Sequence, residues 1–155
     1  MAQTTAARRN GTVAQTTAYG GHGTSGDAMP IQIVALAGEF DISNAREIER
    51  AIEHGITAGA RSFIADLSEV EFLDGGAVHA LVDGWKRAAR RNGRFVLVNP
   101  PARIWRVVIL IGVSRTFRTF ASRQDALTDL LEASRLDPAR RAGDPSGWPA
   151  GGRDS

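Results

Sequence analysis

Few side chains in this sequence combine in a pattern that could carry out catalysis or bind a metal. The three histidines, His22, His54 and His79, have no second histidine or carboxylate at the spacing of a zinc site. There is no cysteine, which excludes disulfides and thiolate metal sites. Neither a P-loop nor a Gly-x-Ser-x-Gly nucleophile motif is present. We therefore expect a protein that is not an enzyme and that holds no metal and no cofactor.

The stretch GHGTSG, residues 21–26, formally matches the glycine pattern of dinucleotide-binding loops. That pattern works only where a strand precedes it and the N-terminus of a helix follows it. Here the preceding residues have no strand pattern, and the following residues predict a strand rather than a helix. We interpret these residues as a linker.

The stretch FLDGGAVHALV, residues 72–82, places two glycines at the start of a predicted helix. Asp74 suits the N-cap position, because its carboxylate can accept hydrogen bonds from the first free amides and its charge suits the helix dipole. Gly75 and Gly76 leave those amides sterically open, so a partner backbone or an anion could approach closely. Sequence drift is an equally good interpretation, since glycine costs less in a first turn than in a helix interior.

Length and composition favour one domain with a tail at each end. Of the 155 residues, 43% are hydrophobic, and no apolar run approaches the ~18 residues of a membrane span. Residues 1–29 predict a disordered N-terminal tail, residues 30–133 the domain, and residues 134–155 a flexible C-terminal tail. Within the predicted domain 13 basic and 13 acidic side chains balance, which argues against direct nucleic-acid binding. We expect a cytoplasmic protein that does not insert into membranes.

Apolar periodicity predicts strands and helices that alternate along residues 30–133. The runs typical of buried strands are residues 31–38, 61–68 and 94–99, with a short extended piece at 116–120. The amphipathic helical segments are residues 43–59, 75–93, 100–112 and 122–133. This order is typical of an α/β domain, with a mixed, mainly parallel sheet of about four strands packed by four helices.

Several short motifs along the predicted domain occur in the order found in one protein family. Residues 30–133 resemble a STAS domain, and the closest type is the bacterial anti-anti-sigma factor, or anti-sigma factor antagonist. The motifs that carry this resemblance are Gly38-Glu39-Phe40-Asp41, Asp66-Leu67-Ser68, Phe72-Leu73-Asp74, Asn99-Pro100 and Ile111-Gly112.

The resemblance implies a binding surface at the loop where such proteins carry Asp-Ser-Ser-Gly. Their partner is often an anti-sigma factor with a histidine-kinase-like ATPase fold, which phosphorylates the second serine and is thereby released. Gly76 takes the position of that serine, so the phosphorylation site is degenerate here. By this resemblance we predict that the partner-binding residues are Asp41, Asp74, Gly75, Gly76, Ala77 and Val78.

A second departure from the family lies at the N-terminus. Members of the family usually have an additional strand before the one predicted at residues 31–38, whereas residues 12–24 have little alternation and make a poor strand. One edge of the sheet would then be unpaired, which would favour either self-association, as in a homodimer, or pairing with a partner.

The sequence thus predicts a binding module similar to an anti-sigma factor antagonist. It would regulate transcription by protein–protein contact, without the serine phosphorylation switch. Two alternatives remain open: a STAS domain that senses a nucleotide or lipid ligand, and a soluble accessory subunit of a membrane transporter.

Overall fold

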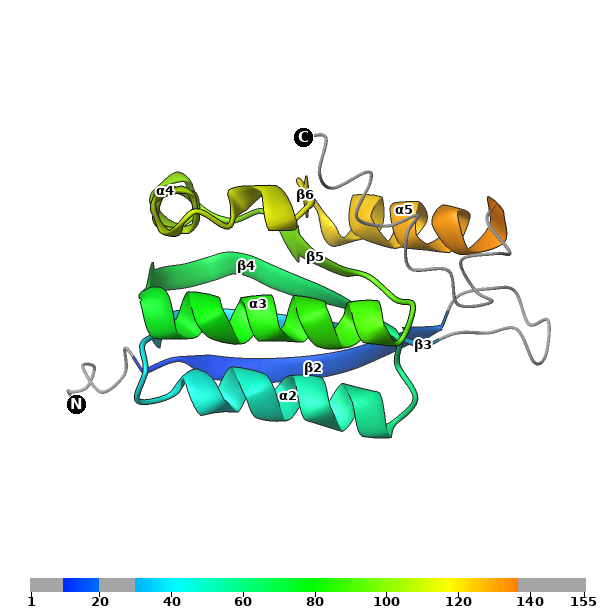
Figure 1. Ribbon diagram of the computed structural model, residues 1–155, viewed down its shortest axis with the longest axis horizontal. Coiled ribbons are helices and arrows are strands. Elements are labelled where there is room, and N and C mark those ends of the chain that lie inside the picture. The colour runs from blue at the N-terminus through cyan, green and yellow to red at the C-terminus, as the bar shows by residue number, and fades with distance from the viewer. Residues whose placement is uncertain (1–9, 20–29, 137–155) are drawn as a thin grey trace.

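The computed structural model describes residues 10–19 and 30–136, which form an α/β domain (Figure 1). The strands in this part of the chain are β2 (Thr12–Tyr19), β3 (Pro30–Phe40), β4 (Ser62–Leu73), β5 (Phe95–Val98) and β6 (Thr119–Phe120). The helices are α2 (Ala45–Thr57), α3 (Gly75–Arg90), α4 (Ala102–Ile111) and α5 (Arg123–Leu136), with a 3₁₀ turn at Ser114–Thr116. The predicted fold class and the four helices are confirmed.

The five strands form one sheet in the order β2-β3-β4-β5-β6. β2 is antiparallel to β3, and every other neighbouring pair is parallel. The predicted mixed, mainly parallel sheet is therefore confirmed, with one strand more than expected. No helix among the described residues is long and apolar enough to cross a membrane.

The additional strand is β2, which lies inside the segment that was predicted to be disordered. The prediction of a tail over residues 1–29 is wrong for Thr12–Tyr19, while residues 1–9 and 20–29 lie outside the described residues. Buried Gln32 of β3 explains part of the pairing: its Nε2 donates to Oε1 of Gln15 at 3.0 Å, and Thr17 Oγ1 donates to its Oε1 at 3.2 Å. These cross-strand bonds provide hydrogen-bond partners for the buried side-chain amide of Gln32.

The C-terminal boundary also lies further along the chain than predicted. Helix α5 continues to Leu136, three residues past the expected end of the domain at residue 133. Residues 137–155, the rest of the predicted tail, lie outside the described residues.

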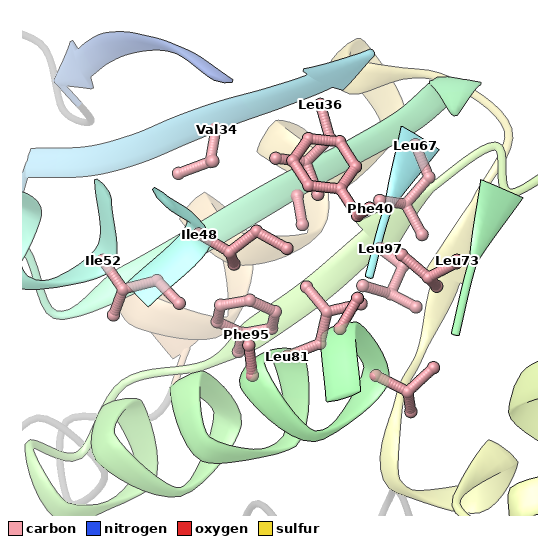
Figure 2. Packing of buried hydrophobic residues seen from close by; sticks show 14 of the residues in the cluster. Val34, Leu36, Phe40, Ile48, Ile52, Leu67, Leu73, Leu81, Phe95 and Leu97 are labelled. Atoms are coloured by element: carbon pink, nitrogen blue, oxygen red, sulfur yellow. The ribbon is translucent and has the colours of Figure 1, made fainter. Parts of the chain in front are cut away.

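Two hydrophobic clusters sandwich the sheet. On one face, α2 and α3 pack against β3, β4 and β5, and the side chains labelled in Figure 2 meet between them. Ile104 and Val108 of α4 extend this cluster at one end. On the other face, Ala126 and Leu130 of α5 cover Ile64 and Val96. Each large apolar side chain that is fully buried contributes about 1.5–3 kcal/mol to folding, so this packing holds α3 against the sheet.

Candidate functional site

Asp74 sets the position at which helix α3 begins. Its side chain accepts a hydrogen bond from the Ala77 amide at 3.0 Å, so the predicted N-cap is confirmed. Its own amide donates to the Phe40 carbonyl oxygen at 3.1 Å, at the end of β3. The first turn of α3 is therefore tied to the loop that leads from β3 to α2.

The two glycines of the first turn have different surroundings. A Cβ atom at Gly75 would have Ile111 Cδ1 as its nearest neighbour, at 3.9 Å, which is an ordinary contact. A Cβ atom at Gly76 would lie 3.0 Å from Ile42 Cβ and 3.1 Å from Ile42 Cα. The expectation that both glycines leave the helix start sterically open is thus wrong for Gly76, because Ile42 already packs closely against it.

The loop that carries Ile42 is held by its own polar side chains. The Asp41 carboxylate accepts hydrogen bonds from the Ser43 hydroxyl and, at 2.8 Å, from the Ser43 amide, and both hold the pKa of Asp41 below its ordinary value. Asn44 accepts from the Asp41 amide at 2.9 Å and donates to the Glu39 carbonyl oxygen at 3.0 Å. These bonds order the turn and leave the Ile42 side chain 79% exposed.

Exposed apolar side chains lie on the segments that adjoin the start of α3. Ile42 lies against Gly76, Ile111 is nearest to Gly75, and Phe72 precedes the Asp74 cap by two residues. Ile109 and Leu110 adjoin Ile111 in the last turn of α4, and Leu110 is 78% exposed. Among the described residues, the large hydrophobic side chains that are exposed are Ile42, Phe72, Ile109, Leu110 and Ile111, which we call the apolar patch.

The sequence prediction of the site missed the whole apolar patch, although one signal for it exists. The run Val107–Ile111 consists of five consecutive apolar residues within α4. A helix on a domain surface buries only one stripe, so an apolar run of this length must expose some of its side chains. Exposed apolar residues that gather in one place mark interaction sites.

Of the six predicted site residues, four are exposed or partly exposed to solvent and two are buried. Asp41 and Gly75 are exposed, and Asp74 and Gly76 are partly exposed. Ala77 and Val78 are 0% and 1% exposed and belong to the core. The prediction that these two contact a partner needs correction: the helix begins at Gly75, so its third and fourth residues already face the sheet.

Asp66, another residue of the family-like motifs, has a structural role on the α5 side of the sheet. Its Oδ1 accepts from the Ser68 amide at 3.0 Å and from the Ser68 hydroxyl at 2.7 Å, and its Oδ2 accepts from Arg123 Nε at 2.6 Å. Burial raises the pKa of Asp66, but these bonds and the Arg123 charge outweigh burial and lower it. Asp66 therefore joins β4 to the first turn of α5.

The described residues offer little for metal chemistry. His54 and His79 are exposed on α2 and α3, and no group of three or more histidine, cysteine, aspartate or glutamate side chains could hold a metal ion in this part of the chain. The arrangement offers a surface on which a partner could bind. The capped start of α3 lies between Ile42 and Ile111, and the other exposed apolar side chains lie on the adjoining segments.

Comparison with known proteins gives consistent results. Residues 27–126 match the STAS domain. The anti-sigma-F factor antagonist RsfB of Mycobacterium tuberculosis is 28% identical to this chain over 114 residues, which cover 74% of the chain and 92% of RsfB.

Solved structures agree with the sequence relatives. An anti-sigma factor antagonist from Mycobacterium paratuberculosis matches with a TM-score of 0.55 and 26% identity, over 76% of this chain and 94% of that one. The Bacillus cell fate determinant SpoIIAA in its phosphorylated form matches with a TM-score of 0.52 and 16% identity, over 74% and 98% of the two chains. The second match shows the fold alone.

Proposed function

The chain belongs to the STAS domain family, and from that premise we propose that it acts as an anti-sigma factor antagonist. It would regulate transcription by binding rather than by catalysis. The names of its relative in Mycobacterium tuberculosis and of the structure from Mycobacterium paratuberculosis support this function. The observation that carries the proposal is the apolar patch around the start of α3, where a protein partner would gain the most from removing side chains from water.

The partner we propose is an anti-sigma factor with a histidine-kinase-like ATPase fold. Arg106 is exposed on α4, one helical turn before Ile109 and Leu110, and so places a positive charge beside the apolar patch. The matching surface would be apolar at its centre, with an acidic group facing Arg106. We place this complex in the cytoplasm.

We further propose that the binding is not switched by phosphorylation of the loop. Gly76 takes the position where the family carries its phosphorylated serine, and residues 75–77 have no hydroxyl group. A Cβ atom at position 76 would lie 3.0 Å from Ile42 Cβ, so a serine there would require Ile42 to shift by a few tenths of an ångström. An apolar contact thus replaces the acceptor of the phosphate, and the chain would stay competent to bind when ATP is present.

Titration calorimetry with each anti-sigma factor of the source organism tests the function. We expect one of them to bind the wild-type chain, and the double variant Ile42→Ser/Leu110→Ser to bind it at least about tenfold more weakly, since truncated anchor residues commonly cost more than 1 kcal/mol. Both side chains are largely exposed, so the fold should be retained, with an unchanged thermal unfolding curve.

The control variant is Glu53→Ser, which alters an exposed side chain of α2 outside the apolar patch. It should bind like the wild-type chain. If no anti-sigma factor binds, the function is wrong. If one binds equally well to the double variant, the function stands but the apolar patch is not the site.

A further inference from the structure

Strand β2 forms one border of the sheet. Its eight residues pair with β3 in an unbroken register, from Thr12 opposite Ala37 to Tyr19 opposite Pro30. No described strand lies on its other side. Alternate amides and carbonyls of an edge strand point away from the sheet, so β2 presents a row of backbone donors and acceptors to its surroundings.

Within its described residues, β2 has none of the charged side chains, prolines or bulges by which proteins usually block pairing at an edge. The sequence TVAQTTAY contains no charged residue, no proline and no glycine, and its pairing with β3 shows no bulge. The register between β3 and β4, by contrast, shifts twice near Gly38. At the opposite border, β6 is only two residues long and follows the charged Arg118. The two edges are therefore not equivalent, and β2 is the one suited to accept another strand.

The side chains of β2 indicate which strand it accepts. Thr12, Ala14 and Thr16 are exposed, and the side chains on both faces of the strand are uncharged. Two copies of β2 related by a twofold axis would run antiparallel, and their opposing residues would bring uncharged side chains together without repulsion. Helix α2, which runs beside β2, exposes Arg46 and Arg50 as well as Glu47, so the helices of two copies would also meet with mixed charge (Figure 1).

We propose that β2 pairs with β2 of a second copy of this chain and joins the two sheets into one. The contact would consist mainly of backbone hydrogen bonds and would bury little apolar surface, so the dimer should form in a concentration-dependent way. This surface differs from the apolar patch, and the proposal does not depend on which partner binds there.

Sedimentation velocity of the full chain over a range of concentrations tests the dimer. The wild-type chain should shift from 16.6 kDa towards twice that mass as its concentration rises. Thr16→Lys and Thr16→Glu should each stay monomeric, because the twofold axis would bring like charges close together near the middle of the joined strands. An equimolar mixture of the two variants should restore the dimer through opposite charges.

The matched control is Thr119→Lys, which places the same charge on β6 at the other edge and should leave the dimer intact. Thermal unfolding of the Thr16 variants should show folded protein, since the residue is exposed on its strand. A wild-type chain that stays monomeric at every concentration would overturn the proposal. So would a dimer that persists in both Thr16 variants, or variants that fail to recover the dimer when mixed.

Discussion

Helix α3 contains glycines in its interior and in its first turn, and the two places differ in what the missing side chain makes possible. In the interior, a Cβ atom at Gly84 would lie 2.6 Å from Ile52 Cδ1 and 2.8 Å from the Phe95 ring. Gly84 therefore lets α3 lie close to α2 and to the sheet. In the first turn, a Cβ atom at Gly75 would meet nothing closer than Ile111 at 3.9 Å.

The difference separates residues that build the fold from residues that shape its surface. Gly84 is required by packing, because three elements meet at that point. Gly75 is not required by packing, and its neighbours are side chains exposed to solvent. Gly76 is intermediate: its neighbour Ile42 packs against it and is nevertheless a large part of the exposed apolar patch. Gly75 is therefore free to serve binding, while Gly84 in the interior of the helix is not.

Gly84→Leu should have the largest effect on folding. The added side chain would overlap Ile52 and Phe95, and overpacking of this kind costs about 3 kcal/mol of unfolding free energy. Urea denaturation measures the loss. The same substitution at Gly75 is the matched control, because it lies in the same helix with room around it, and we expect a change within about 0.5 kcal/mol. Equal losses at the two positions would contradict the contrast.

The three aspartates of the family-like motifs, Asp41, Asp66 and Asp74, extend the comparison. Asp66 is buried and bonded to Ser68 and Arg123, so Asp66→Ala should cost about 2 kcal/mol at neutral pH, since hydrogen bonds to charged groups are the stronger kind. Because the pKa of Asp66 is lowered in the folded chain, its ionised form stabilises the fold. That contribution is complete above the ordinary pKa of 3.8 and is lost as the pH falls further.

The Asp66 prediction can be tested further by measuring the unfolding free energy as a function of pH. The difference between the wild-type chain and Asp66→Ala should shrink as the pH falls below 3.8. Asp41→Ala is the control, because the pKa of Asp41 is also lowered by Ser43 but its carboxylate is exposed. A loss at Asp66 no greater than the loss at Asp41 would show that the bond to Arg123 contributes nothing.

Asp74→Ala should have a smaller effect, because the bond it removes caps a helix at a partly exposed position. Loss of the bond to the Ala77 amide should cost about 1 kcal/mol, the usual magnitude for an N-cap. Asp74→Asn is the control, since asparagine also caps helices well and should retain most of the stability. An unchanged denaturation midpoint in Asp74→Ala would rule out the capping role.

The sequence predicted those parts of the fold that depend on local pattern. Residues 63–67 of β4 are all buried, and four of the five are apolar, which made the strand recognisable. The Asp74 cap was recognisable because a cap requires only an acceptor before a helical pattern. Strand β2 was missed because its exposed residues are threonine, alanine and glutamine, and its stability comes from pairing with β3.

The candidate site was predicted less completely, and the reason is also physical. The motif located the start of α3, but the packing of Ile42 against Gly76 joins residues 34 positions apart and leaves no local pattern. The burial of Ala77 and Val78 depends on how the helix meets the sheet, which the motif does not encode. Only the run Val107–Ile111 carried a readable sign of the apolar patch.

The central claim is that this chain binds its anti-sigma factor through the apolar patch and without a phosphorylation switch. The most direct test incubates the wild-type chain with that anti-sigma factor and ATP, removes the nucleotide, and then measures the intact mass of the chain and its dissociation constant for fresh anti-sigma factor. We expect no phosphate added to the chain and an unchanged dissociation constant. A phosphate on the chain together with a weaker complex, whether at Ser68 or at a residue beside the start of α3, would contradict this proposal.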